Sequence, residues 1–182
     1  VRHVVDVNGN TTITAEKDNS FLMKDSALGH SSGLICGSGG SGTNSELTVT
    51  AKTGNNTVYL DPSSPDRYFT GVYTGGTGAS VILSAPQGEN RIVAKIDSDA
   101  ARQTLAKYGL SSPEMASFDG VEAYYSHGRI SLEAQRNIIE IFPVQFGSRK
   151  YSYQARGISM PGYSGSQINL TAQQDNIVRA GA

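Results

Sequence analysis

Short stretches of alternating apolar and polar residues, each closed by turn-forming residues, run along most of this chain. Examples are RHVVDV (2–7), SELTVTA (45–51) and NRIVAKI (90–96), with DPSSPD (61–66) and APQGE (85–89) as intervening turns. Alternation with a period of two is typical of strands that bury one face. We therefore expect a mainly β protein.

Several of these stretches are separated by residues that favour tight turns. Asn8-Gly9 lies between 2–7 and 10–15, and Ser126-His127-Gly128 lies between 121–125 and 129–134. Asn-Gly is the pair that best tolerates the positive φ angles of a two-residue hairpin. The pattern predicts antiparallel pairing, in a β-sandwich or a jelly-roll-like domain.

One segment has helical rather than strand-like spacing. Ala101, Leu105 and Tyr108 follow each other at i, i+4 and i+7, and Asp97 or Ser98 can cap the first turn. We expect one helix near 98–108, inserted between two β-rich portions.

The length of 182 residues and the formal net charge of -1 limit the remaining possibilities. The length suits one domain, 1–182, with a possible N-terminal hairpin or arm at 1–20 and a flexible Gly/Ser loop at 37–45. The charge argues against a nucleic-acid partner, because such proteins neutralise phosphates with an excess of Lys and Arg. No apolar run is long enough to suggest membrane insertion.

Three segments are similar to one another: TITAEKDN (12–19), TVTAKTGN (48–55) and NLTAQQDN (169–176). Their unequal spacing does not match a solenoid repeat. Recurring turn chemistry is the simpler interpretation.

GLICGSGGSG (33–42) contains a G-x-G-x-x-G pattern at Gly37, Gly39 and Gly42, next to the single cysteine, Cys36. A dinucleotide-binding loop leads into a helix that binds the pyrophosphate, whereas this one leads into a strand-like stretch. We expect a loop or hinge, and we expect Cys36 to be a small buried residue rather than a nucleophile.

The histidines do not suggest a metal site. His3, His30 and His127 lie far apart in the sequence and have no partner at ligand spacing. Asp97 and Asp99 could ligate calcium, but helix capping explains them equally well. We expect no metal and no other cofactor.

PGYSGS (161–166) resembles the G-x-S-G around the nucleophilic serine of chymotrypsin-like proteases. The resemblance implies Ser164 as the nucleophile, His30 as the base and Asp97 as the third member. It covers four residues, and LGHSS (28–32) lacks the alanine-histidine pair usual in that family. We prefer to interpret the segment as a turn, and we expect the protein not to be an enzyme.

Tyrosines are candidates for an interface, because they give rigid contact area at low entropic cost. The candidates are Tyr68, Tyr73, Tyr151 and Tyr153, together with Pro143, which interrupts a strand-like stretch and marks an edge. Ordinary strand packing is the alternative for the tyrosines.

By elimination, the sequence favours a structural protein of an assembly that associates with itself and with other subunits. The expected class is a virion component, such as a capsid decoration or cement protein, a minor capsid protein or a tail protein. We expect a homo-oligomer with symmetric contacts, on a virion or an extracellular surface. The first alternative is a secreted or surface β-sandwich that binds glycans or protein, and the second is the serine protease.

Overall fold

The computed structural model describes residues 2–23, 30–37, 43–60, 68–95, 117–142, 154–162 and 164–180. Twelve strands form in these ranges: β1 (Arg2–Val7), β2 (Thr11–Ala15), β3 (Asn19–Met23), β4 (His30–Cys36), β5 (Glu46–Ala51), β6 (Asn56–Leu60), β7 (Tyr68–Thr74), β8 (Ser80–Lys95), β9 (Ser117–Ala123), β10 (Arg129–Phe142), β11 (Gln154–Ser159) and β12 (Gln167–Ala180).

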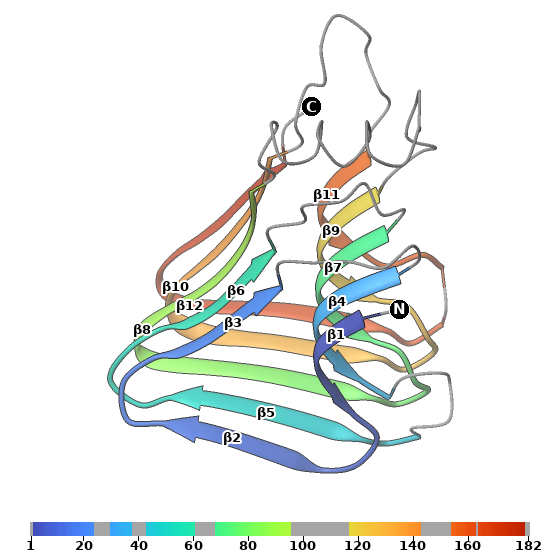
Figure 1. The fold of residues 1–182 in the computed structure, drawn as a ribbon, viewed down its shortest axis with the longest axis horizontal. Helices are drawn as coiled ribbons and strands as arrows, with labels where there is room; N and C mark the ends of the chain where they lie inside the picture. The colour runs from blue at the N-terminus through green and yellow to red at the C-terminus, as the bar shows by residue number, and fades with distance from the viewer. Residues whose placement is uncertain are drawn as a thin grey trace, which may run out of the picture.

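All the pairings between these strands are parallel. The first sheet has the order β1-β4-β7-β9-β11. The second has the order β12-β10-β8-β5-β2, with β3 and β6 added beside the far half of β8. The chain therefore winds as a coil, and each turn of the coil, here called a rung, crosses both sheets before the next one begins (Figure 1).

The described strands form five rungs: β1-β2-β3, β4-β5-β6, β7-β8, β9-β10 and β11-β12. In the first two rungs the second sheet is crossed by two short strands, and in the last three by one long strand that bends. The fold is a parallel β-solenoid, in which each rung contacts mainly its neighbours.

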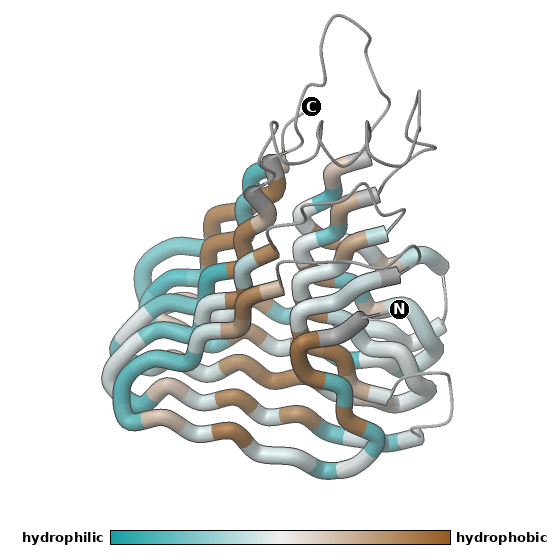
Figure 2. Tube along the Cα trace, viewed as in Figure 1, coloured by the Kyte–Doolittle hydropathy of each residue, from teal (hydrophilic) through white to brown (hydrophobic). Residues whose placement is uncertain are grey.

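The core lies between the sheets and contains buried apolar residues from successive rungs. Hydrophobic positions recur along the strands of both sheets in Figure 2. Leu47, Val49, Val81 and Leu83 are completely buried, and they come from alternate positions of β5 and β8. The Phe69 and Phe118 rings stack in register, 5.0 Å apart and nearly parallel. Equivalent positions thus repeat the same contact from rung to rung.

A row of glycines lets the first sheet approach the second. A Cβ atom at Gly71 would meet Ile92 Cγ2, and it would lie 2.6 Å from the carbonyl oxygen of Gly120 on the next rung. Gly33, Gly120 and Gly157 occupy the equivalent positions of β4, β9 and β11.

The expected antiparallel sandwich or jelly roll is wrong, because the sheets are parallel throughout. The strands that flank Asn8-Gly9 pair with β4 and β5 rather than with each other. Neither Asn8 nor Gly9 has the positive φ of the expected hairpin turn. Ser126-His127-Gly128 likewise joins two sheets. A hairpin and a solenoid corner both need tight turns between alternating strands, so this local pattern does not distinguish them.

The similar segments at 12–19, 48–55 and 169–176 are true repeats, contrary to the simpler interpretation. Thr12 pairs with Thr48 and Ala15 with Ala51 on the neighbouring rung. Ala134 pairs with both Ala85 and Ala172. The third and fourth rungs have the same corner, after Ala85 and Ala134, but their sequences there are less similar to these segments.

The expected helix near 98–108 lies outside the described residues, as do Pro143, Tyr151 and Tyr153. Residues 2–15 of the possible N-terminal arm form part of the first rung, where β1 pairs with β4 and β2 with β5. Among the described residues, no helix is long and apolar enough to cross a membrane.

Candidate functional site

A ladder of asparagine side chains runs through all five rungs at the bend of the second sheet. Asn19 donates to Asn56 over 2.9 Å, Asn56 to Asn90 over 2.9 Å, Asn90 to Asn137 over 3.0 Å, and Asn137 to Asn176 over 2.9 Å. Each bond runs from a side-chain Nδ2 to an Oδ1 on the following rung. The ladder therefore has a direction.

The same side chains satisfy the backbone at the bend. Asn90 Nδ2 also donates to the carbonyl oxygens of Leu83 at 3.0 Å and Glu133 at 3.2 Å. Asn56, Asn90 and Asn137 are fully buried. A buried carbonyl without a partner is costly, so the ladder allows the strands to turn inside the molecule without losing hydrogen bonds.

The two ends of the ladder differ. At the first rung, Asn19 Oδ1 accepts no hydrogen bond from any described residue, whereas its Nδ2 is engaged. At the last rung, Asn176 Oδ1 accepts from Asn137, while its Nδ2 donates only to Leu170 O among the described residues, at 3.2 Å. One end thus offers an acceptor and the other a donor.

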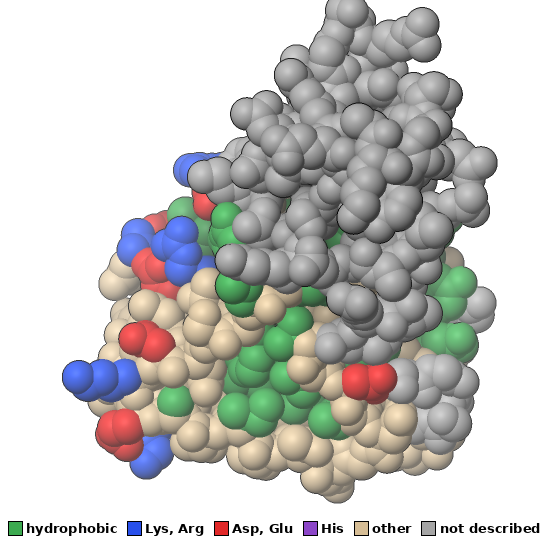
Figure 3. Space-filling model, viewed as in Figure 1, with side chains coloured by type: hydrophobic (Ala, Val, Ile, Leu, Met, Phe, Trp, Pro, Cys, Tyr) green, Lys and Arg blue, Asp and Glu red, His purple; other side chains and the backbone are tan. Residues whose placement is uncertain are grey.

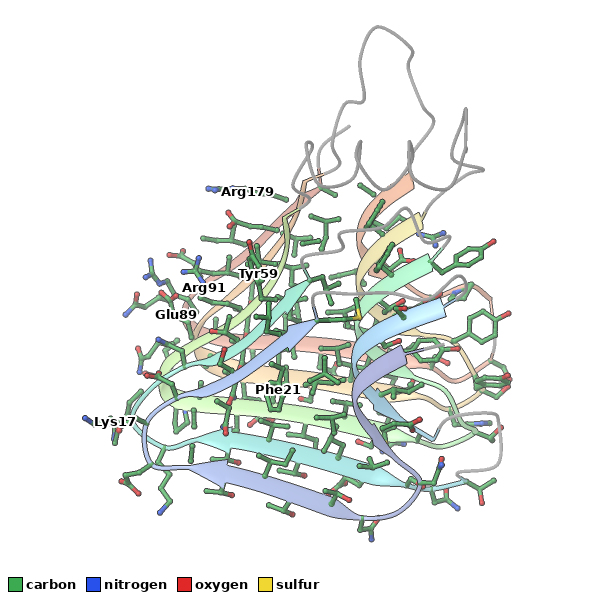
Figure 4. The ribbon with its side chains drawn as sticks, in the orientation of Figure 1. Lys17, Phe21, Tyr59, Glu89, Arg91 and Arg179 are labelled. Carbon is green, nitrogen blue, oxygen red and sulfur yellow. The ribbon has the colours of Figure 1, made fainter. Side chains whose placement is uncertain are left out.

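Apolar side chains lie at both ends of the coil. Val5, Val7 and Ile13 of the first rung pack on the core and are only partly buried. Hydrophobic side chains gather on the face of the molecule that Figure 3 shows, and Phe21 lies in the space between the sheets at this end (Figure 4). At the opposite end, Ile168 and Leu170 of β12 are likewise only partly buried.

A second polar group lies on the outer face of the first sheet. Asp119 of β9 accepts two hydrogen bonds from Arg156 of β11, from Nε at 2.6 Å and from Nη2 at 2.8 Å. Glu122, three residues further along β9, accepts from the Thr70 hydroxyl at 3.3 Å. Asp119, Glu122 and Thr70 are buried. The hydroxyl of Ser32, in register beside Thr70, has no hydrogen-bond partner among the described residues.

The surroundings of the carboxyl cluster shift the pKa values of Glu122 and Arg156. Burial, and then the charge of Asp119, raise the pKa of Glu122 to about 7, against the opposing effect of Arg156. The hydrogen bond to Asp119 raises the pKa of Arg156 further above its usual value. The cluster therefore combines a fixed ion pair with a carboxyl group that is close to half protonated at neutral pH.

The sequence-predicted catalytic residues are not brought together. Ser164 is exposed in the turn after β11, and its carbonyl accepts from the backbone N–H of His127 at 3.0 Å. His30 begins β4, which is three strand spacings, about 14 Å, from β11 and at the opposite end of the strands. Asp97 lies outside the described residues. The protease arrangement of Ser164 with His30 is not present.

The glycine stretch at 37–42 lies mostly outside the described residues. It leads into β5 rather than into a helix, and its first glycine, Gly37, has a φ of 79°. Gly39 and Gly42 lie outside the described residues. Cys36 is fully buried, and burial raises the pKa of its thiol, so it is not a ready nucleophile. In the described part of the chain, no group of three or more His, Cys, Asp or Glu could hold a metal ion.

Two interface candidates lie in the described part of the chain. Tyr68 is 52% exposed at the start of β7, whereas Tyr73 is buried and its ring centre is 6.1 Å from that of Tyr124. Of these two, Tyr68 is the exposed residue.

Neither the ladder nor the carboxyl cluster was predicted from the sequence. The ladder had a signal, since two of the three similar segments end at Asn19 and Asn176. The cluster had only a weak one: Asp, Gly and Glu at 119, 120 and 122 recur in no other rung.

No family model, curated protein or solved structure matches this chain significantly. The geometry of the coil and of its ends is therefore the basis on which a function can be argued.

Proposed function

We propose that this protein is a non-enzymatic structural element of an assembly on a virion or an extracellular surface, and that its copies stack end to end. The observation that carries the proposal is the asparagine ladder, which ends in an acceptor at the first rung and in a donor at the last. The last rung of one copy could therefore continue the ladder into the first rung of the next.

The sequences of the two end rungs support this pairing. The first rung carries T-A-E-K-D-N (14–19) and the last carries T-A-Q-Q-D-N (171–176). Within the molecule, neighbouring rungs place such segments in register, as Ala15 on Ala51 shows. A docked copy would place Asn176 against Asn19 by the same geometry.

The end surfaces provide a driving force and backbone partners. Partly buried apolar residues, such as Ile13 at one end and Leu170 at the other, would lose contact with water on stacking. The first and last rungs also form the outer edges of the sheets, where strands present unpaired N–H and C=O groups. Strand addition at such an edge is a common mode of association.

The two ends are unlike, so a contact between them is head to tail and differs from the symmetric contact that the sequence favours. A head-to-tail contact that does not close on itself produces an open filament. This arrangement suits a fibre or stalk better than a closed ring.

The test uses one variant for each end, examined alone and mixed. Ile13→Lys places a charge on the first rung, and Leu170→Lys places one on the last. The wild type should form filaments under the electron microscope. Each variant alone should stay monomeric by sedimentation, because one surface of every contact is blocked. Their mixture should form one-to-one dimers and nothing longer, because one intact end of each kind remains.

Leu22→Lys is the matched control, because Leu22 is already 46% exposed on the outside of β3. This variant should form filaments like the wild type. Circular dichroism checks that each variant keeps its β structure. A wild type that stays monomeric at high concentration, or a mixture that forms no dimer, contradicts the proposal.

A further inference from the structure

A cavity of about 430 Å³ lies at the corner between the two sheets, away from the ends of the coil and from the carboxyl cluster. Its lining comes from the second, third and fourth rungs and includes Asn44, Glu46, Ser80, His127 and Arg129. The volume is in the range of small-molecule sites.

Two glycines let larger side chains pack closely at this corner. Gly78, on the third rung, has a φ of 69° and forms part of the lining. Asn44 of the second rung lies beside it, since a Cβ at Gly78 would be 2.5 Å from Asn44 Oδ1. On the fourth rung, the His127 ring packs on Gly165, where a Cβ would be 2.7 Å from His127 Cδ2. Asn44 thus packs on Gly78 of the third rung, and His127 packs on Gly165 of the fifth.

The backbone of this corner is strained at two positions. Asn44 has a φ of 56° and His127 a φ of 59°, and they are the two non-glycine residues with positive φ in the described part of the chain. Both line this cavity. Glycine would be the less strained choice at either position, and strain of this kind concentrates at functional sites. The side chains of Asn44 and His127 are therefore candidates for direct contact with a ligand.

The charges of the cavity are arranged in one row. Glu46 of β5 and Arg129 of β10 both pair in register with Ser80 of β8, which lies between them. Two strand spacings separate their backbones by about 10 Å. The guanidinium of Arg129 has no hydrogen-bond or ion-pair partner among the described residues, whereas the Glu46 carboxylate accepts from Thr48 at 3.2 Å. The cavity thus offers one cation, Arg129, and one anion, Glu46, with the neutral donors and acceptors of Asn44 and Ser80 beside them.

This set of groups selects a ligand with one carboxylate and several hydroxyls. A guanidinium binds a carboxylate through two parallel hydrogen bonds. Ser80, Asn44 and Glu46, which line the same cavity as Arg129, can pair with hydroxyl groups. We propose that this corner cavity is a binding site for an acidic sugar residue of a glycan, with its carboxylate on Arg129.

The test measures binding of two probes, methyl β-D-glucuronide and the methyl α-glycoside of N-acetylneuraminic acid, by NMR titration. The neutral ligand control is methyl β-D-glucoside. At least one acidic probe should bind saturably and shift the amide signals of Gly78 and Ser80. The glucoside should bind at least about tenfold more weakly, since it lacks the charged partner of Arg129.

Three variants test the assigned roles. Arg129→Gln should weaken binding of the acidic probe by about tenfold or more. Arg179→Gln, which changes an exposed arginine that pairs with Glu140, is the matched control and should bind like the wild type. His127→Gly should also weaken binding, although glycine relieves the strain at this φ and should keep the protein folded.

Three outcomes overturn the assignment. The first is the absence of saturable binding for both acidic probes up to about 10 mM, a concentration at which even weak single-sugar sites fill. The second is equal binding of the glucoside, which would assign a neutral ligand. The third is an Arg129→Gln variant that binds the acidic probe like the wild type. None of these outcomes bears on the stacking of the coil ends.

Discussion

Asn90 occupies the middle of the asparagine ladder and bonds to groups on three rungs. It accepts from Asn56, and it donates to Asn137 and to the carbonyls of Leu83 and Glu133. Its removal would leave several buried polar groups without partners, whereas Asn176 at the end of the ladder is exposed to water. An asparagine of the ladder should therefore contribute more to the stability of the protein in an inner rung than in the last rung.

We expect Asn90→Ala to lower the free energy of unfolding by about 2–4 kcal/mol, because buried donors and acceptors lose their partners. Asn176→Ala should cost less than about 1 kcal/mol, because water replaces the lost bonds. Urea unfolding of both variants measures the difference. Equal losses would show that the ladder does not stabilise the interior of the coil.

Glu122 should make stability depend on pH. Its pKa is about 7 in the folded protein, against 4.5 for an unperturbed side chain, so the folded protein holds an additional proton between these values. The groups that face it are Asp119, Arg156, Thr70 and Tyr73, from β9, β11 and β7. The free energy of unfolding should therefore fall by about 2–3 kcal/mol as the pH rises from 4.5 to above 7.

The control for this dependence is Glu122→Gln, which can keep the bond to Thr70 but does not ionise. Urea unfolding near pH 5 and near pH 8 should show that the variant is the more stable protein at the higher pH. The two proteins should differ little at the lower pH. A wild type whose stability rises between these pH values would contradict the assignment.

At the scale of the strand, close approach between rungs depends on the glycine row. Gly71→Ala would place a methyl group against Ile92 and against the backbone of Gly120, which cannot move aside as a side chain can. We expect a loss of at least about 2 kcal/mol in the free energy of unfolding. Gly9→Ala is the control, since no atom lies within 4 Å of a Cβ there. Thermal unfolding should shift for Gly71→Ala and hardly at all for Gly9→Ala.

The strands themselves could be predicted from the sequence, because each alternates between a buried and an exposed face. The predicted stretches at 2–7, 45–51 and 90–96 overlap β1, β5 and β8. Their pairing could not be predicted. Alternation fixes which face is buried, but it does not show whether the next strand returns beside the last or begins another sheet.

The repeat was hidden by corners of unequal length. Three residues separate Ala15 from Asn19, four separate Ala51 from Asn56, and two separate Ala134 from Asn137. The distance between successive ladder residues also varies, from 34 to 47 positions. A solenoid tolerates such differences at its corners, because register is fixed by the strands and by the ladder.

The corner cavity was the part of the molecule that the sequence predicted least well. Asn44 and His127 are far apart in the sequence, and only the winding of the coil brings them into one cavity. His127 was predicted to lie in a turn, and it does. This turn joins two sheets, however, and is not the predicted hairpin. The positive φ of His127 and the cavity beside it depend on rungs that a local pattern does not reveal.

For the whole molecule, association should depend little on salt. The formal net charge is -1, and the ion pair of Lys52 with Glu16, which joins the first two rungs, is exposed at 58% and 71%. Exposed pairs contribute little, and the proposed contact relies on strand edges and apolar side chains. We expect the association constant to change less than about threefold between about 50 mM and about 500 mM NaCl, measured by sedimentation velocity. Dissociation at the higher concentration would indicate an electrostatic contact instead.

Every ladder bond joins residues 34 to 47 positions apart, and none joins the first rung directly to the last. A rung can therefore become complete as soon as the next few dozen residues are present, without waiting for the remainder of the chain. The first rungs can order while later ones are still being synthesised or exported. In such a chain, the rungs nearest the N-terminus can fold first and the later rungs can fold after them.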